Sequence, residues 1–205
     1  MPKKAGIVFV AMGAVLMLSA LLLFSNNRQE DEQAGQEAQA ALEAVQAAIE
    51  EQAASSPDET ESSEQPSAVL IDGYEYIGFL SIPSLELELP IMADWDYNRL
   101  KLAPCRQAGA VETDDLVIAG HNYKRHFGYL KDLEPGSSVT FTDLQGSTTS
   151  YEVIHVYTID PKAVDTVLNS EYDLVLYTCT YGGATRVGVF CDRADGSSSI
   201  HSGGD

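Results

Sequence analysis

The sequence predicts an all-β domain with only short helices, carried behind an N-terminal membrane anchor. Two observations predict the β domain. Apolar and β-branched runs recur at short intervals after residue 69, and each run is bounded by Gly, Pro, Asp or Ser. Seven or so strands at this spacing indicate an antiparallel barrel or sandwich. The third observation is a long uncharged apolar segment near the N-terminus, which predicts the anchor.

The expected strands are short and separated by turn residues. They cover Tyr74 to Ile82, Leu87 to Met92, Leu116 to Ala119, Ser138 to Thr142, Thr149 to Tyr157, Leu174 to Thr178 and Arg186 to Cys191. Short helices are expected around Tyr97 to Leu102, Tyr129 to Leu133 and Ala163 to Leu168. These elements place the folded domain at residues 69–195, followed by a flexible Gly/Ser-rich tail at 196–205.

The segment 5–24 is uncharged and has the length of about twenty residues that a helix needs to cross a bilayer. Lys3 and Lys4 precede it and acidic residues dominate after Arg28, so residues 1–4 are expected in the cytoplasm and the rest outside. A cleaved signal peptide is the alternative, but its apolar region is usually shorter and ends at a small-x-small site. The pattern favours an uncleaved, single-pass signal-anchor in the cell membrane.

Residues 25–54 are acidic and rich in Ala, Glu and Gln, which predicts a helical stalk. Leu42, Val45 and Ile49 form an apolar stripe of barely two heptads, too short to argue for a stable coiled coil, so a solvated spacer is expected. Residues 55–68 combine Pro, Ser and acidic residues and predict a flexible linker.

Charge and cysteine content exclude several classes of protein. The chain of 205 residues has a formal net charge of -19, which disfavours binding to the phosphate backbone of nucleic acids. Its three cysteines, Cys105, Cys179 and Cys191, are too few and too scattered for a disulfide framework or a zinc site with paired spacings. At least one thiol therefore stays unpaired within the chain.

Three residues at predicted strand ends have the chemistry of a cysteine enzyme. Cys179 ends an apolar strand and Arg186 opens the next one, so a tight hairpin would bring a guanidinium beside the thiol and favour its thiolate form. His121 follows another apolar strand, where an imidazole can give and take protons. Together they supply a nucleophile, an acid/base and an oxyanion stabiliser.

Other residues of the same types fit these roles less well. Cys191 lies within a strand, Cys105 is expected in a loop, and a disulfide between them is left open. His155 lies mid-strand, His126 in a charged loop and His201 in the tail. Arg193 ends its strand where Arg186 begins it, so we expect it at the far end of the domain. Asp114 and Asp115 are expected in a solvated turn, with calcium binding as the alternative.

The chain resembles the sortases, transpeptidases of Gram-positive cell surfaces. The resemblance rests on the segment IAGH ending at His121, on LYTC ending at Cys179 where the family has TLxTC, and on Arg186 at the start of the next strand. The segment from Ser81 to Ile91, SIPSLELELPI, is similar to the family's first barrel strands. These motifs span about Ile77 to Arg193.

The resemblance implies an eight-stranded closed β-barrel and a cysteine transpeptidase. The thiolate of Cys179 would cleave an LPXTG-like sorting signal of secreted proteins through a thioester, with His121 as acid/base and Arg186 holding substrate and oxyanion. The acceptor would be an amine of a peptidoglycan precursor or a pilin lysine. No cofactor is implied, although some members bind calcium. Ala119, Tyr177 and Thr178 would line the substrate groove.

Departures from the family narrow the subclass. About sixteen residues separate the strands ending at Tyr157 and starting at Leu174, too few for the long helical insertion of class B. The linker lacks the Asp-Pro-aromatic motif of a pilin-type lid. Two other functions remain alternatives: an anchored extracytoplasmic binding domain with a degenerate barrel, and a cell-wall cysteine peptidase.

Overall fold

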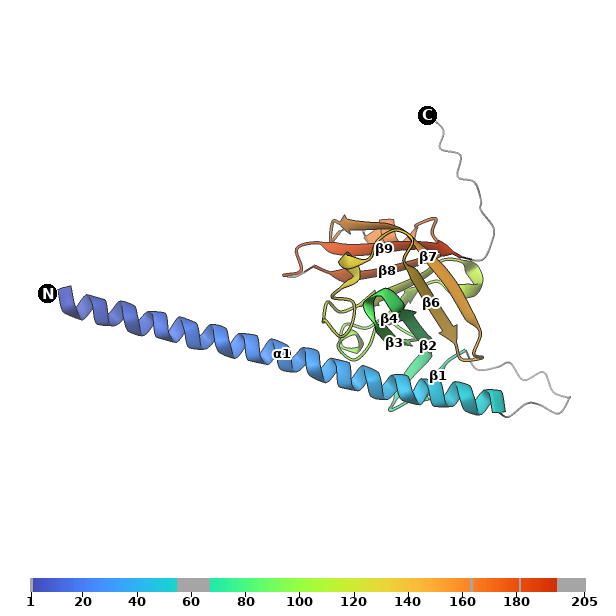
Figure 1. Ribbon diagram of the computed structural model, residues 1–205, viewed down its shortest axis with the longest axis horizontal. Helices are drawn as coiled ribbons and strands as arrows, with labels where there is room; N and C mark the ends of the chain where they lie inside the picture. Colours follow the sequence, from blue (N-terminus) through green and yellow to red (C-terminus); the bar gives the residue numbers. More distant parts are fainter. Residues whose placement is uncertain (1, 55–66, 163, 181, 195–205) are drawn as a thin grey trace, which may run out of the picture. The chain divides into compact units, whose positions relative to one another are not determined.

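The computed structural model describes residues 2–54, 67–162, 164–180 and 182–194, and it divides into two compact units, Met1–Gln33 and Ala34–Asp205 (Figure 1). Most of the predicted linker at 55–68, the predicted tail at 196–205 with His201, and Ala163 lie outside the described residues. One helix, α1 (Pro2–Ala54), begins in the first unit and ends in the second.

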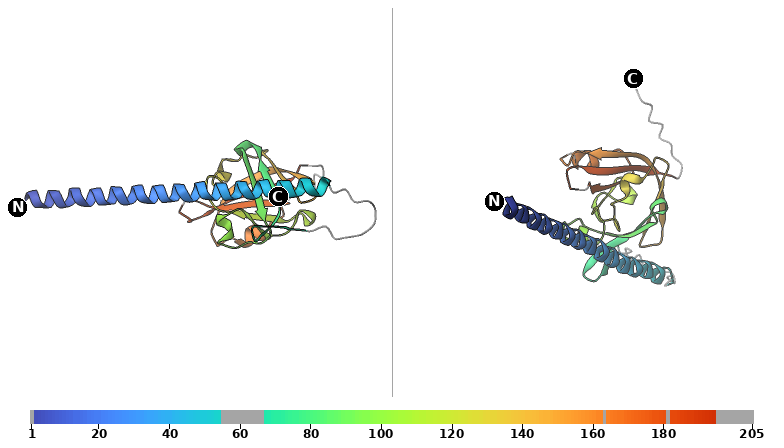
Figure 2. Two further views of the ribbon diagram at one scale, coloured as in Figure 1. Left: turned by 90° about the horizontal axis from the view of Figure 1, so that it is seen from below. Right: turned by 60° about the vertical axis from the view of Figure 1, so that its left-hand side comes forward.

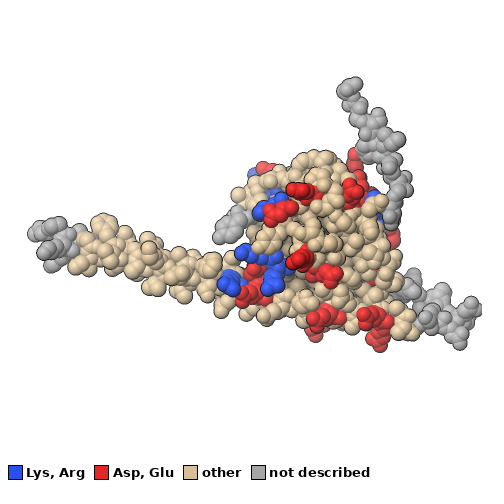
Figure 3. Space-filling view, in the orientation of Figure 1, with Lys and Arg blue, Asp and Glu red and all other residues tan. Residues whose placement is uncertain are grey.

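The first unit contains the apolar part of α1, residues 6–24, and the polar residues 25–33 that follow it. Its large side chains are exposed on every side: Leu21, Leu22 and Leu23 keep 64%, 71% and 71% of their surface open. An 18-residue window reaches a mean hydropathy of 2.8, so the helix is long and apolar enough to cross a membrane by length and composition. Figure 3 shows this stretch without Lys, Arg, Asp or Glu side chains. It is therefore a candidate anchor.

The rest of α1, from Ala34 to Ala54, packs against the barrel. Ala38, Leu42 and Val45 keep only 2%, 2% and 0% of their surface exposed, and Ile49 packs on the same apolar cluster as Val45. Figure 2 shows this part of the helix alongside the barrel. The expectation of a solvated spacer is therefore wrong for residues 34–54, because the apolar stripe covers an outer face of the sheet.

The second unit is a closed β-barrel. Its strands are β1 (Val69–Ile71), β2 (Tyr74–Ile82), β3 (Leu87–Met92), β4 (Cys105–Ala108), β5 (Leu116–Gly120), β6 (Ser138–Asp143), β7 (Thr148–Ile159), β8 (Leu174–Cys179) and β9 (Arg186–Arg193). The sheet order is β1-β2-β3-β4-β5-β8-β9-β7-β6, and β2 also pairs with β6. Strands β2 to β9 thereby close an eight-stranded barrel, as predicted, and β1 extends its edge at β2.

All seven predicted strands are present, with ends that shift by at most two residues. The sequence pattern misses β1 and β4. Strand β4 is four residues long, Cys-Arg-Gln-Ala between Pro104 and Gly109, and it has no apolar alternation to signal a strand. The expectation that Cys105 lies in a loop is corrected, because its backbone pairs with Ala119 on one side and Met92 on the other.

The barrel is mixed, which corrects the expectation of an antiparallel one. The pairs β3–β4 and β5–β8 are parallel. Parallel neighbours need a crossover connection, and between β5 and β8 the chain passes through β6, β7 and the short helix α2 (Val164–Leu168). That connection holds no long helical insertion among its described residues. The remaining helices are 3₁₀ turns: η1 (Pro83–Leu85), η2 (Arg99–Lys101), η3 (Val111–Thr113) and η4 (Leu130–Asp132).

Strand alternation separates an inner from an outer face. Ile118 of β5, Leu176 of β8 and Val189 of β9 belong to the interior cluster and are fully buried. Their neighbours Val117 and Val175 point outward into a second cluster beside α2. The outward-facing side chains of β5 and β8 therefore form one continuous surface, which extends to the carboxyl ends of both strands.

Candidate active site

Strands β5 and β8 bring His121 and Cys179 to the same edge of the sheet. The two strands are parallel neighbours in the register Leu116 with Leu174 through Gly120 with Thr178. Cys179 is the last residue of β8, and His121 immediately follows β5. Gly120 and Thr178 are register partners, so the residues that follow them, His121 and Cys179, lie at the same level of the sheet edge. Both side chains are partly buried.

Arg186 lies directly across from Cys179. The two residues are register partners in the antiparallel pair β8–β9, which places their side chains on one face, with Cβ atoms typically about 5 Å apart. The guanidinium Nη1 of Arg186 donates to the carbonyl oxygens of Gly183 and Thr185, at 3.1 Å each. These bonds hold the cation at the loop between the two strands, beside the thiol.

A hydrogen bond joins the loops that carry the thiol and the imidazole. Asn122 Nδ2 donates to the carbonyl oxygen of Thr180, 3.4 Å away, so the residue after His121 contacts the residue after Cys179. The ring of His121 stacks on Tyr123, with centroids 3.9 Å apart and an interplanar angle of 17°. Sequence reasoning missed both Asn122 and Tyr123, although a run of polar residues behind a buried strand is a usable signal.

The predicted groove residues divide between the two faces of the sheet. Ala119 and Tyr177 are register partners on the outer face, which they share with Cys179. Tyr177 donates from its hydroxyl to Oε1 of Gln107 at 3.0 Å. Burial raises the pKa of Tyr177 to about 12, and the charge of Arg186 acts in the opposite direction. Thr178, 3% exposed, alternates to the inner side, so the structure does not group it with the other two.

The other two cysteines are buried, and Arg193 lies at the far end of β9. Cys105 and Cys191 are free thiols with no exposed surface, in two different apolar clusters. Burial raises the pKa of both, that of Cys105 to about 12. Arg193, at the far end of β9, forms an ion pair with Asp114 at 2.5 Å and thus lies at the opposite end of the barrel from Arg186, as expected.

The other two described histidines, His126 and His155, pack against neighbouring residues. His126 has no exposed surface, so the loop in which it was expected packs inward. His155 stacks on Tyr157 within β7, with ring centroids 5.1 Å apart. Among the described residues, no group of three or more His, Cys, Asp or Glu side chains is arranged to hold a metal ion. Asp115, named as a calcium alternative, accepts hydrogen bonds from Thr113 and the backbone of Ala110.

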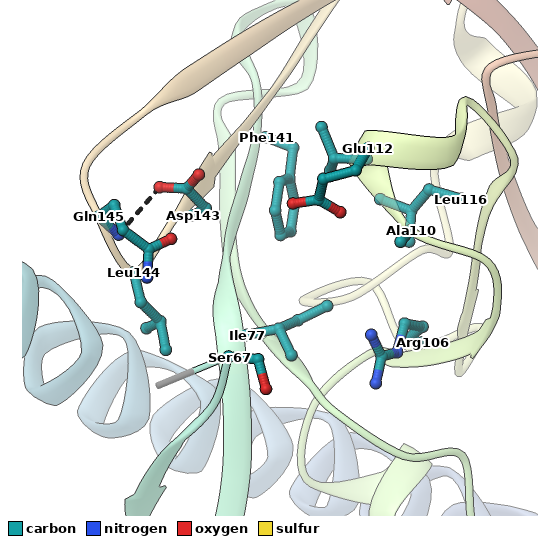
Figure 4. A pocket seen from close by; sticks show the side chains of 11 residues that line it. Ser67, Ile77, Arg106, Ala110, Glu112, Leu116, Phe141, Asp143, Leu144 and Gln145 are labelled. Carbon is teal, nitrogen blue, oxygen red and sulfur yellow. Dashed lines mark hydrogen bonds between the residues drawn. The ribbon is translucent and has the colours of Figure 1, made fainter. Parts of the chain in front are cut away.

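A cavity of about 310 Å³ lies elsewhere in the barrel (Figure 4). Arg106, Glu112 and Asp143 bring charged groups to its wall, and Phe141 and Leu116 supply apolar surface. Leu116 is the first residue of β5, whereas His121 follows the last one. The cavity is therefore distinct from the edge that carries Cys179, and none of the predicted site residues lines it.

The chain belongs to the sortase family. The model of the sortase domain matches residues 80–194, more than half of the chain, which includes all three residues at this edge. Sortases are a family of cysteine transpeptidases, and the chain is a sortase-type protein by family and by fold. A search of the curated proteins finds no match.

Solved structures of sortases share the fold. Sortase C1 from Streptococcus agalactiae has a TM-score of 0.53 and 25% identity, over 62% of this chain and 72% of that one. A sortase D5 transpeptidase from Clostridium perfringens has a TM-score of 0.52 and 20% identity, over 61% and 82%. Sortase A from Corynebacterium diphtheriae has a TM-score of 0.53 and 20% identity, over 85% and 97%. These similarities extend over several sortase classes and leave the subclass open.

Proposed function

We propose that this chain is an active cysteine transpeptidase in which Cys179 is the nucleophile, His121 the acid/base and Arg186 the oxyanion stabiliser. The observation that carries the proposal is the register at one sheet edge. Cys179 pairs with Arg186 across β8–β9, and His121 leaves β5 at the same level. A cation and an imidazole beside a thiol activate it for nucleophilic catalysis, because they favour the thiolate and provide a proton donor and acceptor.

The proposed reaction has two balanced halves. The thiolate of Cys179 attacks a peptide carbonyl carbon, and the guanidinium of Arg186 stabilises the oxyanion that forms. The C–N bond breaks as His121 gives a proton to the leaving amine, which leaves a thioester on the enzyme. A second amine, deprotonated by His121, then attacks the thioester carbon and releases the thiol. The chemistry uses side chains alone and requires no metal or cofactor.

The substrate proposed from the family resemblance is an LPXTG-like sorting signal on a secreted protein. The proposed acceptor is an amine of a peptidoglycan precursor or of a pilin lysine. Lys3 and Lys4 before the apolar span favour a cytoplasmic N-terminus and an extracellular barrel. This topology would place the thiol on the side of the membrane where secreted substrates are found.

The test measures cleavage of a fluorogenic LPXTG-type peptide and acyl transfer to an amine by the full chain in mild detergent. We expect Cys179→Ala to abolish both, while Cys191→Ala, at a buried thiol paired with Leu174 at the other end of β8, keeps the reaction. We expect Arg186→Lys to slow turnover by roughly 10²- to 10³-fold. The same change at Arg193, on the same strand, is the matched control. His121→Gln and His155→Gln form a second matched pair.

Intact-mass detection of a thioester on Cys179 separates the proposed enzyme from its alternatives. A binding domain forms no adduct, and turnover by Cys179→Ala equal to that of the wild type would rule out the proposed role. A peptidase releases the peptide to water whether or not an amine is present. An increase in transferred product with amine concentration is the result expected of a transpeptidase.

A further inference from the structure

The loop that follows His121 lies between the barrel and helix α1. Within it the backbone N–H of Phe127 donates to the carbonyl oxygen of His121 at 3.1 Å, and the N–H of His126 donates to that of Tyr123 at 3.0 Å. His126 and Phe127 have no exposed surface. The loop is therefore a compact turn anchored by two buried side chains, and its position also sets the position of His121.

Aromatic contacts lead from His121 toward α1. The ring of His121 stacks on Tyr123 at 3.9 Å, and Tyr123 meets His126 edge-on at 5.6 Å. The ring nitrogen Nε2 of His126 lies 3.4 Å from the carbonyl oxygen of Ala34 in α1. A carbonyl oxygen can only accept, so Nε2 is the donor. The rings of His126 and Tyr123 thus connect the backbone of α1 to the imidazole of His121.

The helix approaches this loop so closely that only small residues fit. Ala34 and Ala38 are 3% and 2% exposed. A Cβ on Gly35 would lie 2.7 Å from Cγ and 2.9 Å from Cβ of Arg125. Cγ can turn about χ1, but the position of Cβ is fixed by the backbone, so the contact at 2.9 Å is relieved only when the backbone moves. Any larger residue at position 35 must therefore displace the loop.

We propose that His126 is a positioning residue for His121, and that α1 at Ala34 and Gly35 is the support against which it is held. The inference rests on the proposed role of His121 as acid/base. Helix α1 is then part of the active site's framework in addition to being a tether. Nine residues, 25–33, separate the apolar span from Ala34. A disturbance of the helix in this region would reach the chemistry through Tyr123.

The test compares variants of the loop and the helix in the full chain in mild detergent. His126→Leu removes the donor and the ring, and His126→Gln keeps an N–H donor at the same reach. Gly35→Leu forces the loop away from α1. Gly13→Leu is its matched control in the same helix, because a Cβ there meets nothing within 4 Å. We expect His126→Leu and Gly35→Leu to lower kcat about 10- to 100-fold with KM within about twofold, since small misplacement of a catalytic group is costly.

A second measurement needs no peptide substrate. The rate of alkylation by iodoacetamide is followed against pH by intact mass, and it reports Cys179 because Cys105 and Cys191 have no exposed surface. Among the described residues, the charged or titratable groups that the strand register places around this thiol are His121, Arg186 and Tyr177, and of these His121 stacks on Tyr123. We expect the midpoint of the rate profile to shift in His126→Leu and Gly35→Leu, to return toward wild type in His126→Gln, and to stay unchanged in Gly13→Leu.

The outcomes separate the two proposals. Unchanged kcat and an unchanged alkylation midpoint in folded His126→Leu and Gly35→Leu would overturn the positioning role. A loss of stability in urea titrations, with no shift in the midpoint of the alkylation profile, would also overturn it. That combination is the signature of a purely structural contact. If the wild type cleaves no peptide but the midpoint shifts as expected, the proposed function fails and the positioning of His121 stands.

Discussion

Replacement of Val45 by alanine tests whether the second half of α1 is part of the folded domain. The side chain has no exposed surface and belongs to the apolar cluster that also holds Met92 and Tyr76. The change removes two methyl groups, worth about 1.6 kcal/mol in transfer free energy, and leaves a small cavity that adds to the loss. Alanine's higher helix propensity returns at most about 0.7 kcal/mol. The expected net loss in free energy of unfolding is about 1–2.5 kcal/mol.

If Val45 lay in a solvated spacer, the same substitution would raise the free energy of unfolding by up to about 0.7 kcal/mol, because only the helix propensity would change. The assay is urea unfolding of the full chain in mild detergent, followed by the fluorescence of Trp95, the single tryptophan. With a slope near 2 kcal/mol per molar urea, the expected loss lowers the midpoint by about 0.5–1.3 M. Ala47→Val, at an exposed helix position, measures the reverse propensity change without burial. An unchanged or raised midpoint in Val45→Ala would refute docking of the helix.

Three further predictions concern the barrel. Burial raises the pKa of Cys105 from 9.0 to about 12, so the folded protein keeps a proton that the unfolded chain releases. The free energy of unfolding should be flat with respect to this group below pH 9 and fall by up to about 1.4 kcal/mol per pH unit between pH 9 and 12. Urea titrations at several pH values check this, and an equal slope in Cys105→Ala would contradict it. Tyr177→Phe removes the bond to Gln107 and should cost about 0.5–1.5 kcal/mol of unfolding free energy, whereas a gain in stability would contradict the bond. Gly120→Ala puts a Cβ 2.3 Å from the ring of Phe127 and should cost about 1–3 kcal/mol and slow peptide turnover; wild-type stability and turnover would argue against this tight contact.

Local sequence patterns were sufficient for much of the barrel. Alternating and β-branched runs bounded by turn residues predicted seven strands, because a half-buried strand needs that alternation wherever it lies in the chain. Strand β4 was not predicted, because Arg106 and Gln107 interrupt any apolar pattern. Its backbone is held as a strand by pairing with Met92 of β3 and with β5 at Ala119. A strand whose stability comes from its neighbours leaves little signal in its own residues.

The candidate site shows the same division. Cys179, His121 and Arg186 could be predicted as site residues from the sequence, because each stands at one end of an apolar run. The contact of Asn122 with Thr180 could not be foreseen, since it depends on the register between β5 and β8. The stacking of Tyr123 on His121 depends on how the loop after β5 folds back. Register is a property of the pair of strands, and it becomes visible only when both are placed.

The amino-acid pattern alone therefore predicts a membrane-anchor candidate, an acidic helix and an all-β domain with a reactive edge, because hydrophobic length, periodicity and turn residues are local properties. The tertiary structure alone reveals that β5 and β8 run parallel and that α1 packs on the barrel from Ala34 to Ile49. It also brings His126 against Ala34. These are contacts between residues far apart in the chain, and their free energy comes from surfaces that meet only after folding.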